Sequence, residues 1–194
     1  MTATSAWTNR PRELGAVVWH VTMSLDGFIT GPDDSMDFAF RSSLGPSAVS
    51  EEVMRTTGAI LAGRRWHDVA EKRYRGRKGI YGGRWTGPVF VLTHRPKVPS
   101  TDPCIVFLSD GLERAVATAR AAAEGRNLEI FGANVAQQCL QAGLIDEIIA
   151  HLVPVLLGDG VRFYGGPAVR EIGLERTTLG EAGQLTDMRF RVVR

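Results

Sequence analysis

Short runs of β-branched and aromatic residues alternate with amphipathic segments through the first three quarters of this 194-residue chain. Apolar runs of this length are typical of strands that are buried on both faces, as in a parallel sheet. The predicted strands are residues 15–24, 59–63, 88–93, 104–109 and 127–132. The predicted helices are residues 47–58, 110–125 and 134–143, with Asp110 and Glu113 as a capping box, Asn134 as an N-cap and Gly143 as a stop. The alternation predicts an α/β fold.

The last third of the chain changes character. Residues 144–160 are mostly strand by pattern, and residues 174–194 alternate apolar and polar positions, which predicts a terminal hairpin. A parallel sheet with an antiparallel edge follows, with about eight strands and three to four helices. No linker interrupts the pattern, so we expect a flexible lead-in over 1–14 and one domain over 15–194.

Composition excludes several classes of protein. A net charge of +2 without a basic run does not indicate nucleic-acid binding, and no stretch approaches the roughly 18 apolar residues of a membrane helix. The N-terminus lacks the apolar core of a signal peptide, and Cys104 and Cys139 lack metal or redox spacing, so we expect buried, reduced thiols in a cytoplasmic protein. The histidines are scattered without a ligand pattern, which predicts no metal site: His20, His67, His94 and His151.

Three predicted strands end in glycine or in cations. Residues 63–65, 93–95 and 132–134 follow strands that would all end at one edge of a parallel sheet, where α/β proteins bind ligands. Backbone N–H groups at helix starts and guanidinium groups both bind anions. The pattern predicts a dinucleotide across the strand ends, and arginine in place of an acid favours NADPH over NADH.

Residues 71–87, EKRYRGRKGIYGGRWTG, do not fit the strand–helix pattern. Six cations stand among five glycines. Long irregular loops are usually functional or disordered, so two interpretations remain open. One is a mobile flap that brings cations to a phosphorylated ligand, and the other is a solvated surface insertion.

The stretches VTMSLDGFIT, AILAGRRWHD, PVFVLTHRP and IFGANVAQQCLQAGLIDEIIAHLVPVLLGDGVRFY, followed by the terminal hairpin, resemble the dihydrofolate-reductase-like superfamily. More closely, they resemble the reductase domain of the bacterial bifunctional riboflavin-biosynthesis deaminase–reductase, over roughly residues 15–194. The resemblance implies a three-layer fold, with a central eight-stranded mixed sheet flanked by helices and NADPH bound across it.

The resemblance also assigns roles to residues. Residues 63–65 match the family's adenylate-phosphate motif, 93 and 95 the strand end at the 2′-phosphate, 132–135 the turn at the pyrophosphate, and 24–27 the loop beside nicotinamide and substrate. The predicted cofactor-binding residues are Ser24, Asp26, Gly27, Gly63, Arg64, Arg65, Thr93, His94, Arg95, Gly132, Ala133, Asn134 and Val135. Leu156, Gly158 and Gly160 match a turn whose role is structural.

Two departures from the family pattern bear on function. Ala133 replaces a glycine of the family turn, which adds a methyl group where backbone approaches phosphate. Asp37 is the nearest candidate for the acid that protonates the pterin in folate enzymes, and we predict it as catalytic, with a solvated turn acid as the alternative. The zinc signature of the deaminase half is missing, so only the reductive step is expected.

The resemblance implies an NADPH-dependent reductase of a small heterocyclic substrate, of the type that reduces a ribosylaminopyrimidine phosphate in riboflavin synthesis. The arginines of 71–87 would suit a phosphorylated substrate. Reduction of dihydrofolate or another pterin remains an alternative, as does a nucleotide- or flavin-binding protein without turnover. A homodimer is expected from the long apolar run 145–157, unless this run is a central strand buried on both faces.

Overall fold

The computed structural model describes residues 14–41, 47–95, 100, 102–166 and 169–193. All of the predicted lead-in except Leu14 lies outside the described residues, as does Arg194 at the end of the predicted hairpin. Among the described residues, no helix is long and apolar enough to cross a membrane.

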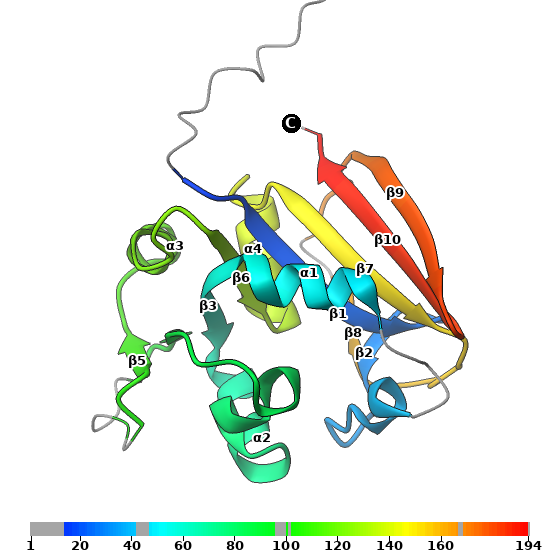
Figure 1. Ribbon diagram of the computed structural model, residues 1–194, viewed down its shortest axis with the longest axis horizontal. Coiled ribbons are helices and arrows are strands. Elements are labelled where there is room, and N and C mark those ends of the chain that lie inside the picture. The colour runs from blue at the N-terminus through cyan, green and yellow to red at the C-terminus, as the bar shows by residue number, and fades with distance from the viewer. Residues whose placement is uncertain (1–13, 42–46, 96–99, 101, 167–168, 194) are drawn as a thin grey trace, which may run out of the picture.

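One eight-stranded mixed sheet organises the chain (Figure 1). Six neighbouring strands run parallel, and β10 and β9 continue the sheet as an antiparallel hairpin. The order is β5 (Ile105–Leu108), β4 (Val89–Leu92), β3 (Thr57–Gly63), β6 (Asn127–Phe131), β1 (Val17–Ser24), β7 (Glu147–Val153), β10 (Leu185–Val192) and β9 (Leu174–Ala182). A small second sheet pairs β2 (Phe28–Thr30) with β8 (Val161–Arg162). The predicted eight-stranded mixed sheet with a C-terminal antiparallel hairpin is confirmed.

Helices cover both faces of the sheet, giving three layers. On one face α3 (Leu112–Ala121) and α4 (Ala133–Gln141) pack on alternate residues of β1, β3 and β6. On the other face, α1 (Ala48–Thr56) runs across β1 and β7, where Val53 packs on Val18 and Ile149 (Figure 1). The helix α2 (Arg64–Arg73), the 3-10 segment η3 (Gly76–Gly83) and the short 3-10 helix η1 (Asp37–Phe40) complete the elements.

Both predicted N-caps are wrong. Gly111 is the N-cap of α3 and Gly132 is the N-cap of α4, and neither helix start has a side-chain cap. Asn134 lies inside α4, where its Oδ1 accepts a hydrogen bond from Gln138. At the start of α4 the chain turns directly from β6 into the helix, and Gly132 takes the cap position with φ +86°, which glycine adopts readily. Helix α3 also ends at Ala121, four residues before the predicted stop.

The long apolar run 145–157 is explained by its place in the sheet. Strand β7 lies between β1 and β10, and Ile148 packs toward α4 while Ile149 packs toward α1. Burial on both faces therefore accounts for the apolar residues. The strand ends at Val153, earlier than predicted, because Pro154 has no N–H to donate to a neighbouring strand.

The segment 71–87 is ordered and packed against the sheet. Its first three residues form the last turn of α2, and η3 follows. Ile80 and Trp85 are buried against Val89 and Val91. The segment is therefore anchored by apolar residues, while most of its cations are exposed, and its role as a flap stays a prediction.

Candidate functional site

A cavity of about 1100 Å³ opens at the carboxyl ends of the parallel strands. It runs from the starts of α2, α3 and α4 to the face of β1 and β7 beneath α1. Ten of the thirteen predicted cofactor residues line it, so the structure brings together three segments that are far apart in sequence. These are Gly63, Arg64, Arg65, Thr93, His94, Arg95, Gly132, Ala133, Asn134 and Val135.

Three helix N-termini face this cavity. Each of α2, α3 and α4 begins directly after a parallel strand or within a few residues of it, and has a glycine N-cap: Gly63, Gly111 and Gly132. Because none has a side-chain cap, the first N–H groups of each helix remain available to an anion, and the helix dipoles add partial positive charge. Gly111 was not among the predicted site residues, because Asp110 and Glu113 indicated a helix capped by a side chain.

The glycines at this edge also permit close packing. A Cβ on Gly132, whose φ is +86°, would lie 3.3 Å from Cβ of Trp66, and a Cβ on Gly63 would lie 3.0 Å from Cγ2 of Val135. Ala133 is only 7% exposed, so most of its methyl group is covered by protein and its backbone N–H still opens α4.

Arginines and carboxylates share the rim of the cavity. Arg64 Nε lies 2.7 Å from Asp68 Oδ1, and Arg65 Nη2 lies 2.7 Å from Asp34 Oδ1. Arg95 is exposed at the end of β4, where its N–H donates to the Thr93 hydroxyl at 3.1 Å. Since these pairs are at least partly exposed, an anionic ligand can compete for the guanidinium groups.

Ser24, Asp26 and Gly27 are not among the residues that line the cavity. The Ser24 hydroxyl donates to Asp26, whose carboxylate also accepts the N–H groups of Leu157 and Gly158. The Ser24 hydrogen bond and these two backbone donors lower the pKa of Asp26 to about 2. The motif ties the turn after β1 to the turn after β7, and contact with nicotinamide stays a prediction.

Asp37 is exposed in η1 and does not line the cavity, although its neighbours Met36 and Ala39 do. Its carboxylate accepts a hydrogen bond from the Tyr74 hydroxyl at 3.3 Å. A catalytic role for Asp37 stays a prediction that this position does not favour.

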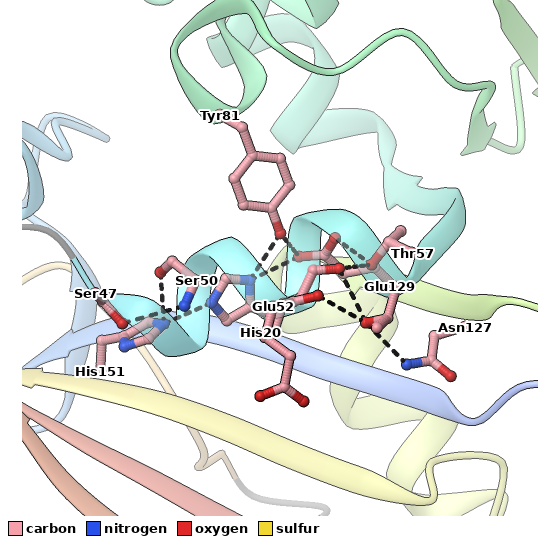
Figure 2. Close-up of polar contacts among 11 residues, drawn as sticks. His20, Ser47, Ser50, Glu52, Thr57, Tyr81, Asn127, Glu129 and His151 are labelled. Carbon is pink, nitrogen blue, oxygen red and sulfur yellow. Dashed lines mark hydrogen bonds and ion pairs between the residues drawn. The ribbon is translucent and has the colours of Figure 1, made fainter.

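The opposite end of the cavity holds a buried polar chain that crosses four strands (Figure 2). His20 Nδ1 lies 2.8 Å from Glu129 Oε1, His20 Nε2 lies 2.6 Å from His151 Nε2, and His151 Nδ1 lies 2.5 Å from Asp187 Oδ1. The Tyr81 hydroxyl donates to Glu129 at 2.7 Å. We call Glu129, His20, His151 and Asp187 the His-pair chain.

Hydroxyl groups complete the surroundings of the His-pair chain. Ser47 donates to Asp187 at 2.8 Å and also caps α1, while Ser50 Oγ lies 3.0 Å from His151 Nε2. Burial, with Glu129 alongside, raises the pKa of Tyr81 far above its usual range, so its hydroxyl stays protonated. Burial, followed by the neighbouring His20, lowers the pKa of His151 despite the hydrogen bond to Asp187.

The spacing of His20 and His151 in the sequence does not predict that the two side chains meet. A signal was present: each stands within an apolar strand, where a polar residue needs a partner. No group of three or more potential metal ligands that could hold an ion occurs among the described residues.

Known proteins resemble this chain in sequence family and in fold. A model of the RibD C-terminal domain matches residues 16–187. A putative riboflavin biosynthesis protein from Shewanella sp. PV-4 is 22% identical, with a TM-score of 0.76 over 92% of this chain and 99% of its own. No curated protein sequence matches the chain.

Two more distant structures share the fold. The deaminase/5-amino-6-(5-phosphoribosylamino)uracil reductase of Thermotoga maritima is 16% identical with a TM-score of 0.62, and the match covers 93% of this chain but 57% of that protein. Dihydrofolate reductase from Enterococcus faecalis, complexed with NADP(H), is 14% identical with a TM-score of 0.59 over 94% of this chain and 99% of its own.

Proposed function

Because this chain belongs to the family of RibD C-terminal domains, we propose that it is an NADPH-dependent reductase of a small heterocyclic substrate. Family membership and the dihydrofolate-reductase-like fold support an oxidoreductase. The substrate that we favour is a ribosylaminopyrimidine phosphate, the type of substrate for which the Thermotoga reductase is named.

The observation that carries the proposal is the convergence of three glycine-capped helix N-termini on one cavity. A dinucleotide has several phosphate oxygens in a row, and the starts of α2, α3 and α4 offer N–H groups along the same edge. The residues present therefore fit NADPH. Arg64 and Arg65 would hold the adenylate phosphates, Arg95 the 2′-phosphate, and Gly132 and Ala133 the pyrophosphate.

When bound, NADPH supplies the hydride. The protein has to orient the substrate, exclude water and place a proton donor. The cavity continues from the predicted phosphate site to His20 and Ser50, so the substrate would lie between the cofactor-binding edge and α1.

Phosphate recognition would not depend on the arginines of 71–87. None of the four arginines of this segment is among the residues that line the cavity: Arg73, Arg75, Arg77 and Arg84. Arg41 is exposed and lines the cavity, so it is the cation that we assign to a substrate phosphate.

Loss of NADPH absorbance on mixing with candidate substrates tests the proposal. We expect turnover with the ribosylaminopyrimidine phosphate and not with dihydrofolate. Turnover with dihydrofolate alone would support the pterin reductase, for which the shared fold with the Enterococcus enzyme is the specific observation. A third outcome is that NADPH raises the melting temperature but is not oxidised with either substrate. This outcome would support a binding protein without turnover.

A further inference from the structure

The His-pair chain occupies four adjacent strands of the sheet. Glu129 comes from β6, His20 from β1, His151 from β7 and Asp187 from β10. The first three lie beneath α1 in Figure 2, and Asp187 accepts a hydrogen bond from Ser47, the N-cap of α1. Their side chains are 0%, 9%, 3% and 6% exposed in that order. Four ionisable groups buried in a row are costly unless each one is paired by hydrogen bonds.

The hydrogen bonds of the His-pair chain determine how many protons it holds. Three hydrogen bonds link the four groups, and each needs one proton between its two heavy atoms. Two neutral imidazoles bring only two protons. With both carboxylates ionised, His20 Nδ1–H donates to Glu129 and His151 Nδ1–H donates to Asp187, so the 2.6 Å contact between the two Nε2 atoms needs a third proton.

Moving the proton to a carboxyl group does not change the count, because the chain still has three links. With both carboxylates ionised, the third proton lies between the two Nε2 atoms, which are 2.6 Å apart. The two carboxylates at the ends balance the resulting charge, which explains how a cation is tolerated at this depth.

One side of the chain opens on the cavity. His20, His151, Ser50 and Tyr81 all line it, and Ser50 is half-buried at the start of α1. The Ser50 hydroxyl contacts His151 Nε2 (Figure 2), and Ser50 also lines the cavity that would hold the substrate. A hydroxyl in this position can pass a proton, since it donates and accepts at the same time.

We propose that the His-pair chain stores one proton and delivers it through Ser50 to the substrate during reduction, a role that rests on the proposed reductase function. A reduced nicotinamide bound beside the substrate would supply the hydride, so that the carbon of a C=O or C=N bond gains a C–H bond. The electron pair of the double bond moves to the heteroatom, which takes the hydroxyl proton of Ser50. His151 Nε2 reprotonates Ser50 with the stored proton, and water refills the chain after product leaves.

The other charged groups near the chain are already paired. On α1, Glu52 is bound by Arg189 of β10, and Glu51 is bound by Arg84 from the end of η3. Tyr81 of η3 donates to Glu129 and stays neutral. The ionisable groups that face the histidine pair directly are therefore Glu129, Tyr81 and Asp187, and Glu129 and Asp187 are positioning residues.

The first test counts protons in the free protein, without cofactor. Nitrogen-15 NMR of histidine side chains at neutral pH should show three N–H protons on His20 and His151 together, one of them shared between the two Nε2 atoms. Two neutral rings with a single N–H each, together with carbon-13 spectra that show Glu129 and Asp187 ionised over the pH range of activity, would overturn the proton store. This readout holds even if the wild-type protein does not oxidise NADPH, a result that would contradict the proposed function alone.

The second test measures delivery in single turnovers of hydride transfer. Ser50→Ala removes the exit hydroxyl without touching the hydrogen bond that caps α1, and we expect the transfer rate to fall about 100-fold while NADPH affinity and KM change little. The wild-type rate should fall as pH rises and the stored proton is lost, and the variant should show a flatter profile.

A matched pair of histidine variants separates chemistry from folding. His151→Gln should lose transfer rate as Ser50→Ala does, whereas His67→Gln, on α2 and outside the cavity lining, should retain it. A Ser50→Ala protein that transfers hydride within twofold of the wild-type rate, with an unchanged pH profile, would overturn delivery through Ser50.

Discussion

Arg95 stands exposed at the end of β4, beside the turn that the Thr93 hydroxyl closes. If this guanidinium binds the 2′-phosphate, Arg95→Ala should weaken NADPH binding about 10- to 100-fold, because a charge-assisted hydrogen bond of roughly 1.5–3 kcal/mol is lost. NADH has no 2′-phosphate, so its affinity should hardly change. Calorimetric titration with both nucleotides measures the difference, and Arg176→Ala on the distant strand β9 is the control. Equal losses for the two nucleotides would refute the assignment.

Asp26 offers a prediction about pH. Hydrogen bonds, first from Ser24 and then from two backbone N–H groups, lower its pKa from 3.8 to about 2, so the ionised form stabilises the fold. This contribution is complete above pH 4 and is lost as pH falls toward 2. Asp26→Asn should therefore melt below the wild type at pH 7, and the gap should narrow below pH 4. Parallel melting curves that keep a constant gap down to pH 2 would contradict this cause.

Sequence patterns predict some of the site residues and not others. The groups at the strand ends, such as Gly63, Arg95 and Gly132, follow their strands directly, and local pattern was enough to place them at one edge. His20 and His151 are 131 residues apart, and their contact exists only because β1 pairs with β7 in a particular register. No local signal contains that register, so the His-pair chain was not predictable as a unit.

At the scale of elements, the start of α4 is the most constrained junction. Gly132 has φ +86° and ψ 133°, a conformation that residues with a side chain rarely adopt, and an added Cβ would crowd Trp66. Gly132→Ala should reduce the free energy of unfolding by about 1–3 kcal/mol and weaken NADPH binding, because the helix start must shift. Chemical denaturation measures the first effect.

Ala133→Gly is the matched comparison for this junction. It leaves the strand-to-helix turn intact and removes a methyl group that is mostly covered, so we expect little change in NADPH affinity and a small loss of stability. Tighter NADPH binding by this variant would instead show that the methyl group obstructs the cofactor.

The helix starts explain why the fold was easier to predict than its details. Strand and helix types follow from periodicity, which is local, and the parallel sheet follows from their alternation. The predicted caps were wrong because Asp110 and Asn134 are good capping residues in general, whereas Gly111, next to Asp110, and Gly132, two residues before Asn134, take the cap positions. The absence of side-chain caps leaves the helix N–H groups available to ligand.

At the scale of the whole molecule, the two edges of the sheet differ. Strand β5 has four residues, whereas β9 has nine, and β9 pairs with β10 on one side only among the described residues. Leu174 and Leu179 are 42% and 56% exposed on β9. A long edge strand with exposed leucines is a template for pairing with another strand. The apolar run of β7 is buried between β1 and β10, so it does not indicate a dimer. The exposed edge strand β9 does indicate one.

We therefore propose a homodimer in which β9 pairs antiparallel with β9 of a second copy about a two-fold axis. Light scattering after size exclusion should give about twice the 21.1 kDa mass of one chain. Leu179→Lys should shift the protein to monomer, because it places a charge in the new interface, while Val106→Lys on the opposite edge should leave the dimer intact. A monomeric wild type would refute the dimer, and a dimer that resists Leu179→Lys but not Val106→Lys would move the interface to β5. Asp187 of the His-pair chain lies on β10, next to β9. If the site is complete within one chain, Leu179→Lys should therefore leave hydride transfer unchanged, and a loss of transfer in the monomer would show that the site needs the second copy.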